Sequence, residues 1–353
     1  MLTRYFLLII VIVIQGIPYL IKKKPVFAKL FLTLSFGELW LLATLRAPTF
    51  ITDDLGYLEM FYSPALCYVE WGYCQLNNFI RLFGTEQYIL FGVLALLIFI
   101  GVAIFIYRYS SNVVWSVLVY VCLMYAFNSL NGVRQFLVLS LVFLAFPLIQ
   151  KRQFVKFLIV VLLACFFHKS AIVLLLFYWL YKVKVNSKNI SILLLCTILI
   201  FTAFSYLGDL YTLLGGSYAH YITTEVEQNH LATIIRFAVN LSIAIFCLLS
   251  FRHKDTSSDA KYPIQIPLSF LTLCACISVS GALISFQSYN VERIVYYFYL
   301  LNIITIPNIL KTISNKSLRT FITIIVMLCL FTYGAIVIWS WQNEGIVYQF
   351  YKR

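Results

Sequence analysis

Acidic residues are scarce in this sequence: only 13 of its 353 residues are aspartate or glutamate, and charged residues of both signs make up 11%. With 62% hydrophobic residues, so little charge excludes a soluble globular protein. The sequence also has no phosphate-binding glycine loop, no dinucleotide-binding motif and no cysteine or histidine spacing that suits a metal. We therefore expect no metal and no other cofactor.

Long apolar runs recur along the whole chain, and each can cross the roughly 30 Å hydrocarbon core of a bilayer. They predict spans at about residues 3–21, 27–45, 88–107, 113–130, 133–149, 154–167, 170–182, 189–206, 232–251, 264–285, 292–310 and 320–341. We expect the first of them to be retained, because no small-residue cleavage site follows it. We expect an all-α polytopic membrane protein with about 10–12 transmembrane or half-membrane helices, in one domain over residues 1–353.

The basic residues that give the net charge of +13 cluster in gaps between the predicted spans. This pattern reports membrane topology and does not indicate binding to nucleic acid. Seventeen of the 26 lysines and arginines fall in gaps that the predicted spans place on one side, which is then cytoplasmic. The opposite side receives ten of the 13 acids and two larger extracytoplasmic loops, at about residues 46–87 and 208–231. Both loops are rich in aromatic residues.

The segment Phe154–Tyr181 decides how the later loops are oriented. It has basic clusters at both ends, and both are cytoplasmic only if the chain turns back near His168. Each arm would then be too short for a comfortable crossing, which favours a re-entrant pair. The alternative is a single straight span, which would place every later basic loop outside.

Two arginines stand at predicted outer helix starts, in the matching strings Asn131-Gly-Val-Arg134 and Asn290-Val-Glu-Arg293. Each asparagine fits a helix N-cap. A cation in a first turn faces the positive end of the helix dipole, at a cost of roughly 0.3–1 kcal/mol. Since backbone N–H groups there already favour phosphate, the repeated arginine indicates an anion site. The alternative is that each arginine extends to the lipid headgroups.

Several further residues could carry chemistry on the same side. His168, at the predicted turn, can accept a proton or donate a hydrogen bond to a phosphate. The first outer loop mixes carboxylates with aromatic rings, which suits the hydroxyls and apolar faces of a sugar. A base for a sugar hydroxyl could be Asp53, Asp54, Glu70 or His168, and the sequence leaves this choice open. Arg46, Tyr57 and Trp71 are predicted substrate contacts in this loop.

Cysteine usage separates one pair from the rest. Cys67 and Cys74 share the first outer loop and could form a disulfide, which an oxidising exterior permits. The other seven cysteines lie in apolar runs and are expected to pack as small hydrophobic residues.

Four strings resemble the EpsG family of bacterial polysaccharide polymerases, which are Wzy-type enzymes for O-antigen or capsule. The similarity covers essentially the whole chain, in order and spacing, and rests on these strings: Glu70-Trp71-Gly72-Tyr73, Asn131-Gly-Val-Arg134-Gln135-Phe, Phe167-His168-Lys169-Ser170-Ala171 and Arg293-Ile-Val-Tyr-Tyr297-Phe. One departure concerns the outer loop: relatives tend to have Gly-x-Asp-Tyr, whereas this chain has Asp53-Asp54-Leu-Gly-Tyr57.

The resemblance implies glycosyl transfer on the outer face of the bacterial cytoplasmic (inner) membrane. The donor would be a glycan on undecaprenyl diphosphate, and the acceptor a lipid-linked repeat unit. A flippase and a chain-length regulator are implied as partners. The predicted catalytic residues are Arg134, Arg293, His168, Asp54 and Glu70, and the predicted substrate-binding residues are Arg46, Asp53, Tyr57, Trp71, Gln135, Lys169, Ser170 and Asn290. The competing interpretations are a transporter of the lipid-linked oligosaccharide and an O-antigen ligase.

Overall fold

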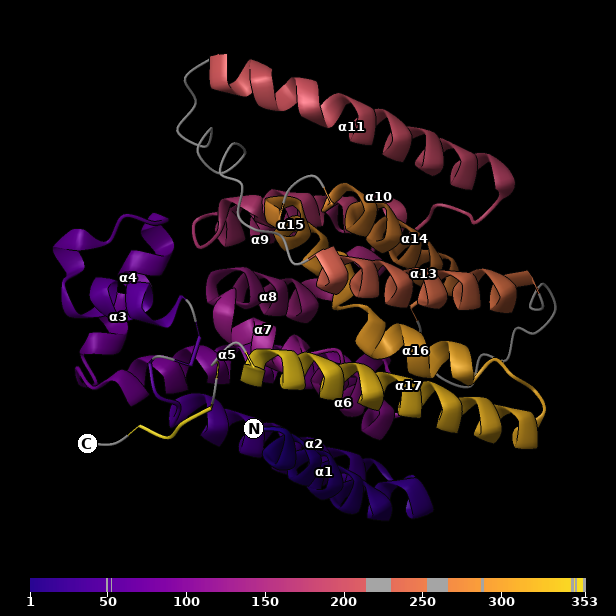
Figure 1. Cartoon of the computed structure of the whole chain (residues 1–353), viewed down its shortest axis with the longest axis horizontal. Helices are drawn as coiled ribbons and strands as arrows, with labels where there is room; N and C mark the ends of the chain where they lie inside the picture. The colour runs from indigo at the N-terminus through magenta and orange to yellow at the C-terminus, as the bar shows by residue number, and fades with distance from the viewer. Residues whose placement is uncertain are drawn as a thin grey trace. The chain divides into compact units, whose positions relative to one another are not determined.

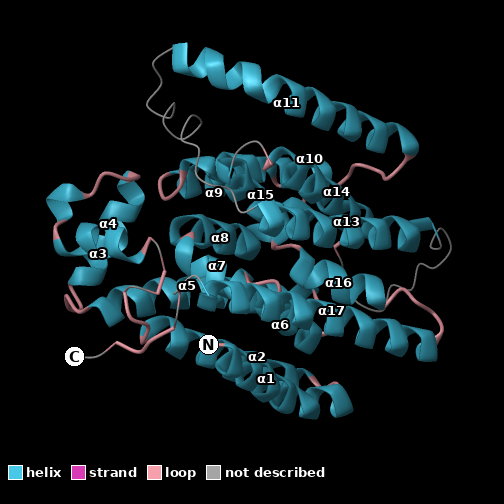
Figure 2. Ribbon diagram, viewed as in Figure 1, coloured by secondary structure: helices cyan, strands magenta, loops and turns pink. Residues whose placement is uncertain are grey.

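The computed structural model describes residues 1–48, 50–51, 53–213, 230–252, 266–286, 289–343, 346 and 348–351. Figures 1 and 2 show helices joined by loops throughout this part of the chain, as the sequence predicted. The predicted outer loop 208–231 lies largely outside the described residues.

Within the described residues, seven helical stretches are long and apolar enough to cross a bilayer. They are α1 (Leu2–Lys22), α2 (Pro25–Thr44), α5 (Gln87–Tyr109), α8 (Val133–Gln150), α13 (His230–Arg252), the stretch Arg293–Leu310 with α15 (Tyr289–Tyr299) and α16 (Asn302–Leu310), and α17 (Lys316–Asn343). An eighth candidate is the pair α6 (Val113–Cys122) and α7 (Tyr125–Asn131), bent by 55°. The shorter apolar stretches are α9 (Phe154–Cys165), η2 (Lys169–Leu175) with α10 (Leu176–Leu180), Ser187–Ala203 within α11 (Ser187–Leu213), and α14 (Leu268–Ile284). The chain is therefore a polytopic α-helical membrane protein.

The segment after residue 153 folds back on itself, which confirms the predicted hairpin. The Tyr178 hydroxyl donates to the carbonyl of Arg152 at 3.0 Å, and the rings of Phe154 and Tyr178 lie 5.0 Å apart. A straight helix would separate residues 152 and 178 by roughly 39 Å at 1.5 Å per residue. The twelve residues of α9 rise only about 18 Å, too little to cross a bilayer.

The chain forms two compact units, Met1–Tyr178 with Ile313–Arg353 (unit 1) and Trp179–Thr312 (unit 2). In unit 2, Asn302 donates to Asn240 at 3.4 Å and Thr197 donates to Ser280 at 2.7 Å, so buried polar groups join its helices. The sequence suggested that the whole chain forms one domain, and this stays a prediction.

The core of unit 1 is built from apolar side chains of α2, α5, α6 and α8. The rings of Phe105 and Phe143 stack at 3.8 Å, which joins α5 to α8. Gly101 brings these two backbones close together, since a Cβ atom there would lie 2.8 Å from the carbonyl oxygen of Ser140. Helices α5 and α8 therefore form a rigid base for the residues at their ends.

One end of unit 1 collects those of its own described segments that the charge pattern assigned to the outside. Gln87 donates to the carbonyl of Arg46, and the rings of Phe127 and Trp341 meet edge to face. Two short helices, α3 (Asp54–Tyr62) and α4 (Trp71–Arg81), lie at this end, at the left of Figure 1. We call it the outer end of unit 1.

Candidate functional site

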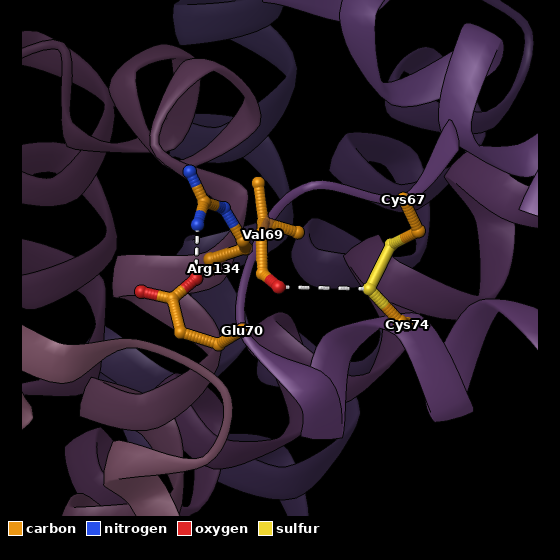
Figure 3. Close-up of a disulfide and its surroundings, with 5 residues drawn as sticks. All are labelled: Cys67, Val69, Glu70, Cys74 and Arg134. Carbon is orange, nitrogen blue, oxygen red and sulfur yellow. Dashed lines mark hydrogen bonds and ion pairs between the residues drawn. A yellow bond between two sulfur atoms is a disulfide. The ribbon is translucent and has the colours of Figure 1, made fainter. Parts of the chain in front are cut away.

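Glu70 lies at the outer end, in the loop between η1 (Pro64–Leu66) and α4. A disulfide between Cys67 and Cys74 closes this loop, as predicted from the sequence, and the Cys74 sulfur lies 3.7 Å from the carbonyl oxygen of Val69 (Figure 3). The bridge restricts the backbone that carries Glu70.

The Glu70 carboxylate connects three groups that are far apart in the sequence. One oxygen, Oε2, forms an ion pair with Nη1 of Arg134, and Figure 3 shows the two side chains pointing toward each other. The other oxygen, Oε1, accepts the backbone N–H of Lys169 at 3.0 Å and lies 3.3 Å from Nδ1 of His168. Three of the four resembling strings therefore meet at one carboxylate.

Glu70 is held in its ionised form. Burial raises the pKa of its carboxyl, but the neighbouring His168 imidazole, the hydrogen bond from the Lys169 backbone and the charge of Arg134 more than offset this and bring the pKa to about 2. An acid with so low a pKa is a weak base at neutral pH. The Glu70 carboxylate is therefore suited to orient its neighbours.

This lowered pKa predicts a specific pH dependence of stability. Because the pKa falls on folding from the ordinary value of 4.5, the contribution of the ionised carboxylate is complete above about pH 4.5 and is lost as the pH falls toward 2. We expect the Tm difference between the wild-type protein and Glu70→Gln to be constant near neutral pH and to shrink below about pH 4.5. A difference that rises on acidification would contradict this assignment.

Gly72 holds the Glu70 loop against the turn after α9. Its backbone N–H donates to the carbonyl of Phe166 at 2.8 Å, and a Cβ atom at residue 72 would lie 2.7 Å from the same oxygen. The neighbouring Trp71 ring meets the Phe166 ring edge to face at 6.1 Å. Two hydrogen bonds thus join the loop to the turn, since the Lys169 N–H also donates to the Glu70 carboxylate.

Replacing Gly72 with alanine should therefore separate Glu70 from His168. The clash is with backbone atoms, so we expect a loss of about 1–3 kcal/mol in stability together with reduced function. Gly56→Ala is the matched control, because its Cβ would meet only the Tyr68 hydroxyl at 3.6 Å. The measurements are the Tm and the amount of polymer formed by each of the two variants. Equal values for Gly72→Ala and Gly56→Ala would refute the contact.

Arg134 is the second residue of α8, which begins at Val133. The prediction that Asn131 caps this helix is wrong: Gly132 occupies the N-cap position and Asn131 ends α7. Instead, the carbonyl of Asn131 accepts the Tyr57 hydroxyl at 3.3 Å. The Nε–H of Arg134 is buried and has no hydrogen-bond partner among the described residues.

The other predicted arginine, Arg293, belongs to unit 2. Its helix α15 begins at Tyr289, so Asn290 lies inside the helix and is not its N-cap, which corrects the prediction. Arg293 is exposed, and the side chain of Asn290 lies outside the described part. That Arg293 and Arg134 bind one anion stays a prediction.

Arg46 and Asp54 form a buried ion pair. Nε and Nη2 of Arg46 donate to the two Asp54 oxygens at 2.8 and 2.7 Å, and the side chains are 1% and 0% exposed. The guanidinium also lies 3.8 Å from the centre of the Phe91 ring. Burial raises the pKa of Asp54, and the hydrogen bonds from Arg46 oppose this rise. The pair fixes the start of α3 to the end of α2.

This burial gives Asp54 a structural role that can be separated from the predicted catalytic one. Asp54→Asn would leave the Arg46 charge buried without its partner, so we expect a loss of about 3–5 kcal/mol in stability. Asp53→Asn, next to it and only half-buried, is the control. Unchanged unfolding of Asp54→Asn with complete loss of product would instead favour Asp54 as the base.

The remaining predicted substrate contacts differ in their exposure. Trp71 is 66% exposed and available to a sugar, and Lys169 is exposed. Tyr57 and Gln135 are buried, and Asp53 and Ser170 are half-buried. Sequence reasoning did not identify Tyr73 as a site residue. Its fully buried ring lies 5.6 Å from Tyr57 and supports it; the only signal was its position in the Glu70-Trp-Gly-Tyr string.

These features define a multi-pass α-helical membrane protein with a charged cluster of carboxylate, guanidinium and imidazole at one end of its helices. The EpsG family pattern matches residues 29–351, which is nearly the whole chain. The protein belongs to the EpsG family, whose members are associated with polysaccharide biosynthesis. No curated protein and no solved structure gives a significant match to the chain.

Proposed function

We propose that this protein is a polysaccharide polymerase. It transfers a growing glycan from undecaprenyl diphosphate to a lipid-linked repeat unit, on the outer face of the bacterial cytoplasmic membrane. The observation that carries the proposal is the Glu70 carboxylate, which joins the Arg134 guanidinium to the His168 imidazole at the outer end of unit 1. The cluster combines an anion-binding group with a proton acceptor, and a transfer from a diphosphate needs both.

Arg134 is the group that binds the donor diphosphate. It stands in the first turn of α8, where backbone N–H groups and the helix dipole already favour an anion. Its guanidinium is 23% exposed, and its Nε–H lacks a partner among the described groups. Arg293, the fifth residue of α15, is proposed as the second cation. As the glycosidic bond breaks, the diphosphate leaves with the electron pair, and positive charge there lowers the barrier.

His168 is the base in this proposal. Oε1 of Glu70 lies 3.3 Å from Nδ1, and a carboxylate there favours the tautomer with its proton on Nδ1, which leaves Nε2 as the nitrogen that accepts a proton. The acceptor hydroxyl gives its proton to Nε2, its oxygen bonds to the anomeric carbon of the donor sugar, and the bond to the diphosphate breaks. The ionised Glu70 then stabilises the imidazolium that forms.

The sugar itself needs contacts with ring faces and hydroxyls. Trp71 is the exposed aromatic residue beside Glu70, and the exposed Lys169 follows His168. We assign Trp71 to the sugar face nearest the bond that is formed. Asp53 and Ser170 are candidate hydroxyl partners because both are partly exposed at the same end.

Glycan analysis tests this proposal against its two alternatives. Cells that lack the protein should display single repeat units on the surface and no long chains. A transporter of the lipid-linked unit predicts that no repeat unit reaches the surface. A ligase predicts long chains that accumulate on the lipid carrier and are not joined to their final acceptor.

A further inference from the structure

A second feature of unit 1 is an apolar cavity of about 320 Å³ that the proposed reaction does not use. It lies between the outer halves of α1, α2 and α17, with α7 and the segment Tyr348–Tyr351 closing it. Its floor is deeply buried, with Ala43 at 0% and Ile338 at 1% exposure, whereas Leu7 and Phe350 at its rim are 56% and 51% exposed. The cavity is therefore open to the lipid at the side of the helices.

The cavity offers few polar groups to a ligand. The Tyr348 hydroxyl donates to the carbonyl of Leu42 at 2.8 Å, and the Tyr5 hydroxyl contacts the carbonyl of Phe331 at 3.5 Å. The walls are otherwise built mainly from leucine, phenylalanine, alanine and isoleucine side chains. Water has too few partners in such a space, so a hydrocarbon chain is the matching occupant.

Two cations stand at the cavity, the Arg4 guanidinium and the Met1 ammonium, which donates to Oε1 of Gln342 at 3.2 Å. Nη1 of Arg4 donates to the carbonyl of Tyr348 at 2.8 Å, while the side chain as a whole is exposed. Tyr348 belongs to a segment held on α2 by two backbone hydrogen bonds, from Ala47 to Gln349 and from Tyr351 to Leu45. A guanidinium has five N–H donors, so this contact leaves donors for a phosphate.

We propose that this cavity binds one chain of a glycerophospholipid whose phosphodiester pairs with Arg4. The free donors of the Arg4 guanidinium pair with the phosphodiester. An undecaprenyl chain is much longer than an acyl chain and exceeds a cavity of about 320 Å³. The bound lipid would join α1, α2, α7 and α17 at the outer leaflet, and this site goes beyond the proposed function.

The test uses full-length protein in detergent, with phosphatidylglycerol that carries a diazirine in one chain. We expect the probe to form cross-links to the cavity walls. Its affinity for Arg4→Gln should be lower than its affinity for the wild-type protein by a factor of about 10 or more, which corresponds to the loss of one charge-assisted hydrogen bond. Arg108→Gln is the control. Arg108 is also exposed, but it lies near the C-terminus of α5, away from the outer end of unit 1. Ala126→Leu narrows the cavity and should reduce cross-linking there for any chain.

Three competitors identify the ligand. Unlabelled phosphatidylglycerol should displace the probe, and diacylglycerol with the same chains should do so about 10-fold less well because it lacks the phosphate. Polyprenyl diphosphate should compete more weakly than phosphatidylglycerol. The proposal is overturned if Arg4→Gln binds as tightly as wild type, if cross-links spread evenly over the helices, or if polyprenyl diphosphate displaces the probe best. None of these outcomes depends on polymerase activity, so the two proposals fail separately.

Discussion

Replacing Arg134 with alanine is expected to slow chain elongation by about 100- to 1,000-fold, the usual effect of removing one group that stabilises developing negative charge. The substitution removes the guanidinium that faces Glu70 at the start of α8, so the leaving diphosphate would lose its partner. The measurement is the rate of polymer formation in membranes supplied with lipid-linked repeat unit, normalised to the amount of protein present.

Arg134→Lys separates charge from geometry. Lysine keeps the charge but loses the planar pair of donors that matches phosphate oxygens, so we expect strong impairment in this variant too. Arg108→Ala is the control for a lost cation. Arg108 is exposed and lies near the C-terminus of α5, away from the outer end of unit 1. Normal chain lengths in Arg134→Ala would remove Arg134 from the site and with it the basis of the proposed function.

Arg293→Ala tests whether Arg293 is the second cation that binds the diphosphate. If both guanidiniums bind one diphosphate, the double variant should be little worse than either single variant, since residues acting on one group are not additive. Independent losses that multiply would place Arg293 in a separate role. Normal elongation in Arg293→Ala would exclude it from catalysis.

The sequence predicted most of the helices, because apolar length and basic gaps report directly on membrane crossing. The segment 88–107 became α5 at Gln87–Tyr109, and the basic residues on both sides of Phe154–Tyr181 were enough to predict the hairpin. The bend between α6 and α7 was not predicted. It occurs at Met124, whose φ of 62° is left-handed, and no glycine or proline marks that point.

The candidate site was predicted residue by residue but not as an arrangement. Glu70, Arg134 and His168 were each identified, yet no periodicity links a loop at residue 70 to helix ends at residues 134 and 168. For Arg46 and Asp54 the sequence suggested contact with substrate and did not reveal that the two side chains pair with each other. An Arg and an Asp in a loop with threonine, glycine and tyrosine suit a sugar, and only tertiary packing distinguishes a binding loop from a buried ion pair.

His168→Ala is expected to lower the elongation rate by about 100- to 10,000-fold, the usual contribution of a positioned base. Substrate binding should change far less than the rate of the chemical step, because Arg134 and Trp71 remain. The measurement is single-turnover transfer at saturating repeat unit, with binding followed separately. A loss confined to binding would assign His168 to phosphate recognition.

Glu70→Gln shows whether the carboxylate acts through His168. Glutamine keeps the shape of the side chain but removes the charge that stabilises the imidazolium, so we expect a smaller loss than in His168→Ala. In the His168→Ala background, Glu70→Gln should change the rate little, since the group it orients is already absent. If Glu70→Gln lowers the rate equally in both backgrounds, the carboxylate acts through Arg134 alone. The contact of 3.3 Å between Glu70 and Nδ1 would then serve the turn after α9 and have no part in proton transfer.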